Sequence, residues 1–141
     1  MDILNYIDKR QSSFLKSVNY RIGDAGKRKK EAKLEYTDKI EVNLNEKKSI
    51  EVIFTRELHF VPDSSFKISV SMGSLLYFNE KEIDNLELDK IDIVEEIKNC
   101  PPIINKLISR TSLLISQLTS SFGSHPVITP PVFVENKEST Q

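Results

Sequence analysis

Apolar side chains recur at every second position through most of the first half of the chain, and this alternation restricts the possible folds more than any other feature. A period of two is typical of β-strands that bury one face and expose the other. We therefore expect an antiparallel sheet of four strands near residues 14–22, 32–44, 50–60 and 66–78. The alternating apolar residues are Phe14, Val18, Tyr20 and Ile22, then Ala32, Leu34, Tyr36, Ile40, Val42 and Leu44, then Ile50, Val52, Phe54, Leu58 and Phe60, and last Phe66, Ile68, Val70 and Met72.

Two residues interrupt this alternation. Arg56 breaks the apolar pattern of the third expected strand, and Gly73 predicts a bulge or bend in the fourth, which continues to Phe78. The stretches between the strands are short and rich in turn-forming residues. Four consecutive strands with such connections favour a β-meander whose helices gather on one face. The predicted fold class is therefore α+β.

Residues 103–122 form the strongest helical pattern of the sequence, because apolar residues recur there at spacings of three and four. Pro101 and Pro102 stand where the first turn of a helix tolerates proline. Gly123 is suited to end the helix, because glycine readily adopts the conformation that follows a last helical turn.

The apolar residues of this helix cover more than one side of it. Ile103, Leu113 and Ile115 lie off the face that carries Ile104 and Leu107. A subunit interface would bury this additional surface, and wider burial within one chain is the alternative. The residues that we expect at an interface between subunits are Leu107, Leu113, Leu114 and Ile115.

The chain has the size of one domain, with 141 residues, and we expect that domain to span residues 1–134. Asp2 is a suitable N-cap for a first helix, and prolines at 126, 130 and 131 keep the last segment extended. The expected parts are a short N-terminal helix (1–11), the four-stranded sheet (12–78), helices (90–123), a proline-rich arm (124–134) and a flexible tail (135–141).

Composition and charge narrow the class of protein. The net charge of −1 provides no overall field for nucleic acid or anionic lipid. The single cysteine, Cys100, cannot form an internal disulfide, which fits a reducing compartment. The N-terminal residues include charges and no apolar run of signal length, and no stretch approaches the ~18 apolar residues of a membrane span. We therefore expect a cytoplasmic protein that does not enter a membrane.

The residue types that usually carry catalysis do not converge in the sequence. His59 and His125 have no cysteine or histidine partners at metal-ligand spacing, so we interpret both as ordinary surface or partly buried residues. Cys100 stands at a helix start but has no basic partner close in sequence, which favours a packed thiol over a nucleophile. The basic residues 27–33 could contact phosphate, but a solvated connection between strands is the simpler interpretation. We expect no enzyme, no metal and no cofactor.

Three segments of the sequence resemble the SecB family of protein-export chaperones. The segment 100–104, with sequence CPPII, resembles the cysteine–proline start of the long SecB helix. The segment 123–133, with sequence GSHPVITPPVF, resembles the proline-rich stretch after that helix. The segment 70–78, with sequence VSMGSLLYF, is similar to the last SecB strand. The resemblance extends over about residues 14–133.

This resemblance implies a subunit with a four-stranded antiparallel sheet, helices on one side, and assembly into homodimers or homotetramers through the long helices. It also implies binding of unfolded or precursor polypeptides in apolar grooves, with transfer to the export ATPase or, in some relatives, protection of an antitoxin. Neither nucleotide nor metal is implied. The peptide contacts that we expect are Leu75, Leu76, Tyr77, Phe78, Ile103, Ile104 and Phe133, and simple core packing is the alternative for each.

The sequence also departs from the family pattern. No segment after Phe133 corresponds to the final SecB helix that covers the groove, so we expect an open and shallower groove. The connection after the first strand is short and basic, and the chain contains no tryptophan. A second hypothesis is therefore a SecB-fold interaction protein with one dedicated partner and no general chaperone activity. A third is a regulator that contacts nucleic acid through its basic residues, although the charge disfavours it.

Overall fold

The computed structural model describes residues 2–22, 32–46, 48–62, 66–122 and 125–134. Its strands are β1 (Ile7–Ile22), β2 (Lys33–Asn45), β3 (Ser49–Val61) and β4 (Phe66–Phe78). Its helices are η1 (Ile3–Tyr6), η3 (Ile83–Asn85), η4 (Leu88–Lys90), α1 (Ile93–Lys98) and α2 (Pro101–Phe122). Several predictions concern residues outside these ranges: the turn at 23–26, the basic residues 27–30, the helix end at Gly123 and the tail 135–141.

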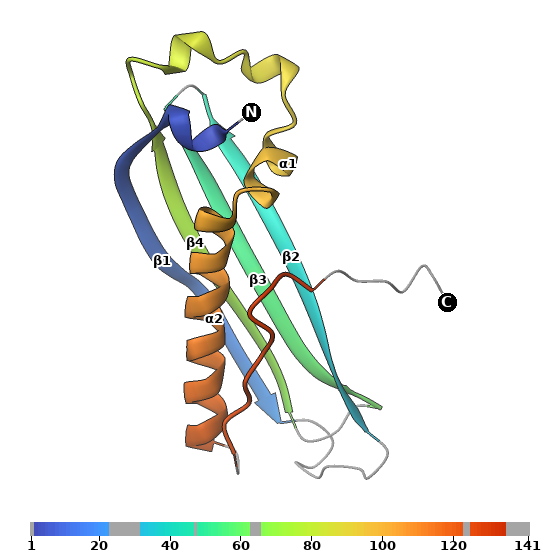
Figure 1. Ribbon diagram of the computed structural model, residues 1–141. Coiled ribbons are helices and arrows are strands. Elements are labelled where there is room, and N and C mark those ends of the chain that lie inside the picture. The colour runs from blue at the N-terminus through green and yellow to red at the C-terminus, as the bar shows by residue number, and fades with distance from the viewer. Residues whose placement is uncertain (1, 23–31, 47, 63–65, 123–124, 135–141) are drawn as a thin grey trace.

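The four strands form one antiparallel sheet in the order β1-β4-β3-β2, with the helices on one face (Figure 1). The predicted α+β class with four antiparallel strands is confirmed. The predicted meander holds only for β2, β3 and β4, because β1 lies beside β4 rather than beside β2. This order is that of a Greek key. Apolar alternation determines which face of a strand is buried but not which strand becomes its neighbour, so the sequence pattern could not distinguish the two arrangements.

The even-numbered residues of β2, β3 and β4 point toward the helices. The register pairs even-numbered residues with even-numbered residues across these strands, since Leu34 lies opposite Phe60 and Leu58 lies opposite Ile68. A register shift between Leu15 and Ser17 changes which residues of β1 face the helices: Leu15 lies opposite Met72 before the shift, and Val18 lies opposite Val70 after it. Phe14, which the sequence pattern placed with the inward residues, therefore lies opposite Gly73 on the outer face.

Helix α2 packs on β4 and β3 and covers the centre of the sheet (Figure 1). Two apolar clusters lie beneath it. The first centres on Phe54, Leu76 and Ile108, and the second on Leu58, Ile68 and Ile115. Because β3 contributes Phe54 to the first cluster and Leu58 to the second, residue 56 lies between them.

The predicted N-terminal helix is shorter than expected. Only Ile3–Tyr6 is helical, as a single 3-10 turn capped by the Asp2 carboxylate, and β1 begins at Ile7. The strand begins this early because Ile7 pairs with Phe78 and Gln11 pairs with Leu76 at the end of β4, with a register shift between the two pairs. Most of residues 7–11 are polar and lie on an edge strand, so no apolar alternation marked them as extended.

Replacing Gly73 should destabilise the sheet. A side chain at this position would collide with the ring of Phe14 and with the Cδ1 atom of Ile53, which is buried. We expect Gly73→Val to lower the free energy of unfolding by ~1–3 kcal/mol, as is usual for overpacking, measured by urea denaturation. The double variant Gly73→Val with Phe14→Ala should recover part of the loss, and strictly additive effects would contradict this account.

Candidate functional site

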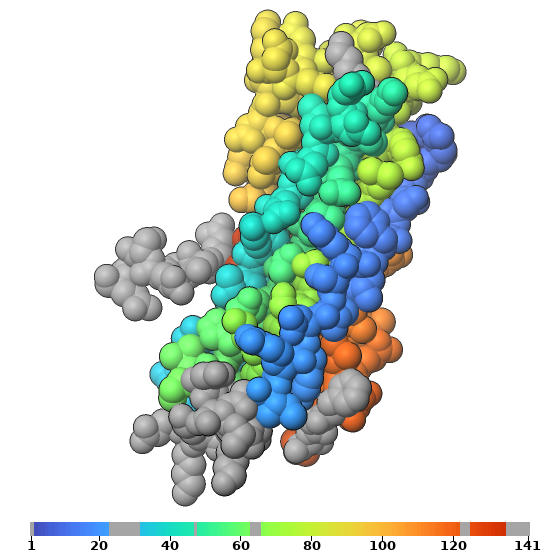
Figure 2. All heavy atoms as spheres, turned by 180° about the vertical axis from the view of Figure 1, so that it is seen from behind, coloured from blue at the N-terminus to red at the C-terminus, as the bar shows by residue number. Residues whose placement is uncertain are grey.

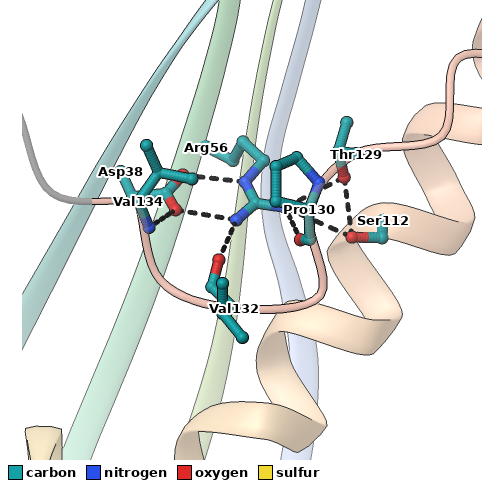
Figure 3. A network of polar contacts seen from close by, with 7 residues as sticks. All are labelled: Asp38, Arg56, Ser112, Thr129, Pro130, Val132 and Val134. Atoms are coloured by element: carbon teal, nitrogen blue, oxygen red, sulfur yellow. Dashed lines mark hydrogen bonds and ion pairs between the residues drawn. The ribbon is translucent and has the colours of Figure 1, made fainter.

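An ion pair between Asp38 of β2 and Arg56 of β3 lies at the centre of the covered face (Figure 3). Both side chains have 0% exposure. The guanidinium donates through Nε to Asp38 Oδ1 at 2.8 Å and through Nη2 to Asp38 Oδ2 at 2.7 Å. Such a two-pronged contact fixes the plane of the guanidinium. A buried charge is tolerated only when its remaining hydrogen-bonding capacity is also satisfied.

The remaining capacity of this pair is satisfied by residues 125–134, which we call the arm. Arg56 Nη1 donates to Thr129 Oγ1 at 2.9 Å and to the Pro130 carbonyl at 2.6 Å. Arg56 Nη2 donates to the Val132 carbonyl at 2.9 Å, and the Val134 N–H donates to Asp38 Oδ2 at 2.7 Å. The pair therefore fastens the arm to the sheet (Figure 3).

Helix α2 contributes a third side to this arrangement. Ser112 lies 3.3 Å from Arg56 Nη1 and shares a hydrogen bond of 2.7 Å with Thr129. Two helical turns after Ser112, Thr119 accepts a hydrogen bond from the Val127 N–H at 2.7 Å. We call Asp38, Phe54, Arg56 and Ser112 together the seat of the arm.

The arm is held on one side only. Phe133 packs edge-on against Phe54, with ring centroids 6.3 Å apart, and Val127 packs against the second apolar cluster. In contrast, Ile128 is 75% exposed and Val132 is 60% exposed. The arm thus lies along the surface between α2 and β2 (Figure 1) and is not a strand of the sheet.

A second candidate surface lies on the other side of α2, along β1. No described strand pairs with the outer edge of β1. A shallow pocket of about 150 Å³ separates the strand from the helix, with Leu15, Met72, Leu107 and Arg110 among its lining residues. Leu15 is 51% exposed. In the view of the outer face, α2 projects past the β1 edge (Figure 2).

Exposed apolar side chains continue along this edge. Val18 is 39% exposed and Ile22 is 69% exposed, both in β1. We call Leu15, Val18 and Ile22 together the edge surface. Apolar side chains that remain exposed beside a pocket are typical of surfaces that bind another protein.

Comparison with known proteins identifies the fold. No protein-family model matches the sequence, and no curated protein matches it. Among solved structures, the SecB-like chaperone of Mycobacterium tuberculosis, in complex with a ChAD peptide from the HigA1 antitoxin, matches with a TM-score of 0.64. The match covers 92% of this chain and 90% of that chain at 11% identity. The chain has the SecB-like fold.

A protein of unknown function from Streptococcus agalactiae also matches, with a TM-score of 0.42 and 16% identity over 88% of this chain and 97% of that chain. The SecB-like fold predicted from three sequence segments is therefore confirmed by the first of these structures. The confirmed features are the four antiparallel strands and the long helix that covers one face.

The structure does not bring the seven expected peptide contacts together on one surface of the SecB-like fold. Four of them, Leu76, Phe78, Ile103 and Ile104, are buried in the first apolar cluster. Leu75 and Tyr77 belong to the outer face of the sheet, where Arg10 stacks over the Tyr77 ring at 5.0 Å from its centroid. Phe133 lies in the arm. A role of these residues in peptide binding stays a prediction.

The four expected interface residues divide in a similar way. Leu107 and Ile115 lie on the buried face of α2, whereas Leu113 is exposed and Leu114 is partly buried. In the single chain, Leu113 and Leu114 are thus the members of this set that a second subunit could reach.

Asp38 and Arg56 were not among the expected site residues. Both occupy even-numbered positions in strands whose other even residues are apolar, and the sequence interpretation treated Arg56 only as a break in the pattern. They lie directly opposite each other in the register of β2 and β3. Opposite charges at inward positions of two neighbouring strands were the signal that could have revealed them.

The groups considered for chemistry are placed as packing or surface residues. Burial raises the pKa of the Cys100 thiol, which favours the protonated and less nucleophilic form. His59 lies on the outer face between Glu35 and Glu57. Within the described residues, no group of three or more histidine, cysteine or acidic side chains could hold a metal ion. No described helix is long and apolar enough to span a membrane.

Removing one member of the buried ion pair should be far more damaging than replacing both. We expect Asp38→Ala to lower the free energy of unfolding by about 3–5 kcal/mol, because it leaves the Arg56 charge buried without its partner. The double variant Asp38→Leu with Arg56→Met should lose much less, since it removes both charges. Urea denaturation compares the variants, and equal losses would contradict the ion-pair account.

Cys100 should react slowly with alkylating reagents. Its raised pKa leaves a smaller thiolate fraction at pH 8, and burial restricts access to the sulfur. We expect iodoacetamide to modify the folded chain at least ~10-fold more slowly than the chain unfolded in urea, as followed by mass spectrometry. Similar rates in the two states would show that the thiol is accessible and activated.

Proposed function

We propose that this protein binds other polypeptides as a SecB-like chaperone and acts without catalysis. The observation that carries the proposal is the exposed apolar edge surface on a SecB-like fold. Apolar side chains that remain exposed beside a free strand edge suit an extended or unfolded chain, because such a chain offers apolar side chains and unpaired main-chain groups together.

The edge surface provides both kinds of contact. Leu15, Val18 and Ile22 offer apolar area, and the edge of β1 that no described strand pairs with offers main-chain N–H and C=O groups. Neither contact depends on a particular client sequence. The expected binding is therefore general and moderate in affinity, which is the behaviour of a protein that holds clients and releases them.

The solved SecB-like chaperone of Mycobacterium tuberculosis carries an antitoxin peptide, which supports a polypeptide partner for the present chain. We include unfolded precursors and an antitoxin among the proposed clients, and the export ATPase as the proposed recipient. The proposed location is the cytoplasm. The proposed assembly is a homodimer or homotetramer in which Leu113 and Leu114 of α2 contribute to the contact.

A scaffold with one dedicated partner is the second candidate function. The small volume of the pocket between β1 and α2, about 150 Å³, favours it, because a pocket of this size accommodates one or two side chains. A dedicated partner would bind with a defined sequence preference, whereas a general chaperone would bind many unfolded chains with similar affinity.

Suppression of aggregation tests the chaperone proposal. A chemically unfolded model precursor is diluted into buffer with the purified protein, and light scattering is followed while the mass of the protein in solution is recorded. We expect suppression by the unaltered protein near one assembly per client chain. Leu15→Lys with Val18→Lys should raise the amount of protein required by about tenfold, because two apolar contacts are replaced by charges.

A matched control uses apolar residues of similar exposure that lie away from the edge surface. Leu44 at the end of β2 and Val61 at the end of β3 meet this condition. Leu44→Lys with Val61→Lys should leave the suppression unchanged. A well-folded protein that never suppresses aggregation would exclude the general chaperone and leave the dedicated scaffold.

A further inference from the structure

We propose that the seat formed by Asp38, Phe54, Arg56 and Ser112 is a second polypeptide-binding site, which receives the main chain of a bent client segment in place of the arm. This inference rests on the proposed function, because it assigns that function an additional site. In the present structure the arm itself occupies the seat and shows which chemistry the seat recognises (Figure 3).

The seat contacts mostly main-chain atoms of its occupant. Arg56 donates to the carbonyls of Pro130 and Val132, and Asp38 accepts from the N–H of Val134. The arm bends at Pro131 and Val132, and this bend directs both carbonyls toward one guanidinium (Figure 3). Every polypeptide except one with proline at the third position carries the same main-chain groups, so these contacts select a segment that can adopt this bend rather than one set of side chains.

The seat is organised in advance of binding. Asp38 holds the guanidinium through two hydrogen bonds, of 2.8 and 2.7 Å, that do not involve the arm. The remaining N–H groups of Arg56 are thereby directed toward the position of the arm. Preorganised donors bind more tightly than mobile ones because their conformational freedom is already restricted.

Apolar contacts at the two ends of the seat define a preference in side chains. Phe133 packs against Phe54 in the first apolar cluster, and Val127 packs in the second. Between them, Ile128 and Val132 point to solvent. The preferred client segment therefore carries an aliphatic residue and, six positions later, an aromatic one, with few restrictions on the side chains between them.

The arm can be replaced without breaking the sheet. It forms no strand, and in the described structure its main-chain hydrogen bonds lead to the side chains of Thr119, Asp38 and Arg56. A client must nevertheless compete with a tethered segment, whose effective concentration is in the millimolar range. The seat should thus be detectable for a second chain once the hold of the arm has been weakened.

The experiment uses the full-length chain with Thr129→Ala and Phe133→Ala, which weaken the arm and leave the seat residues intact. The probe is a fluorescein-labelled synthetic peptide with the sequence of residues 125–134, and fluorescence anisotropy measures its binding. We expect the arm-weakened variant to bind this peptide at least ~10-fold more tightly than the unaltered chain does. Equal affinities would overturn the proposal.

Two further measurements test the individual contacts between the seat and the peptide. A peptide N-methylated at the residue corresponding to Val134 lacks the N–H that Asp38 accepts, and it should bind about tenfold more weakly. Adding Asp38→Leu with Arg56→Met to the arm-weakened chain should abolish the gain in affinity. Unchanged binding of the methylated peptide would show that the main chain is not recognised, and this result does not depend on how the double variant folds.

Client capture distinguishes failure of the seat from failure of the proposed function. If suppression of aggregation responds to Leu15→Lys with Val18→Lys and not to the arm-weakening changes, the edge surface acts alone and the seat is only structural. If the arm-weakening changes increase suppression several-fold, and Asp38→Leu with Arg56→Met removes the increase, clients enter the seat. In both cases circular dichroism verifies that the variants are folded.

Discussion

The ion pair between Asp38 and Arg56 determines how the layers of this protein are joined. It lies between the two apolar clusters, links β2 to β3, and reaches Ser112 of α2 and the main chain of the arm. These two fully buried charges are stabilised because their occupant, here the arm, supplies acceptors for the guanidinium and a donor for the carboxylate. The sheet, the long helix and the arm are therefore joined by one network of hydrogen bonds that lies between two apolar clusters.

The sequence predicts the sheet and the long helix well because burial imposes a period on each. The even-numbered apolar residues from Leu34 to Phe78 define three strands and their inward face, and the spacing of Ile104, Leu107 and Ile108 defines the helix. The position of β1 was harder to predict. Its polar first half lies on an edge, and a register shift changes its parity, so neither its start nor its neighbour is encoded in a simple alternation.

The candidate site was predicted less well, for a related reason. Apolar residues such as Leu76 and Ile104 look alike in a sequence whether they form the core or a binding groove, and here they form the core. The edge surface depends on which strand edge stays free, and this is a property of the strand order. The seat depends on the ion pair between Asp38 and Arg56 and on contacts of Arg56 with the arm from Thr129 onward. Both are contacts between residues far apart in the sequence. A charged residue at an inward position was the local indication of it.

The placement of β1 at the edge beside β4 has a consequence for the order in which the chain folds. Ile22 pairs with Phe66, and Ile7 pairs with Phe78, so β1 must wait for a partner that is synthesised much later. Strands β2, β3 and β4 are connected in sequence and can associate first, whereas the closing of β1 requires a large loop and is expected to be slow. During that interval β1 and the facing edge of β4 remain unpaired. A protein proposed to protect other unfolded chains therefore passes through an incompletely folded state during its own synthesis.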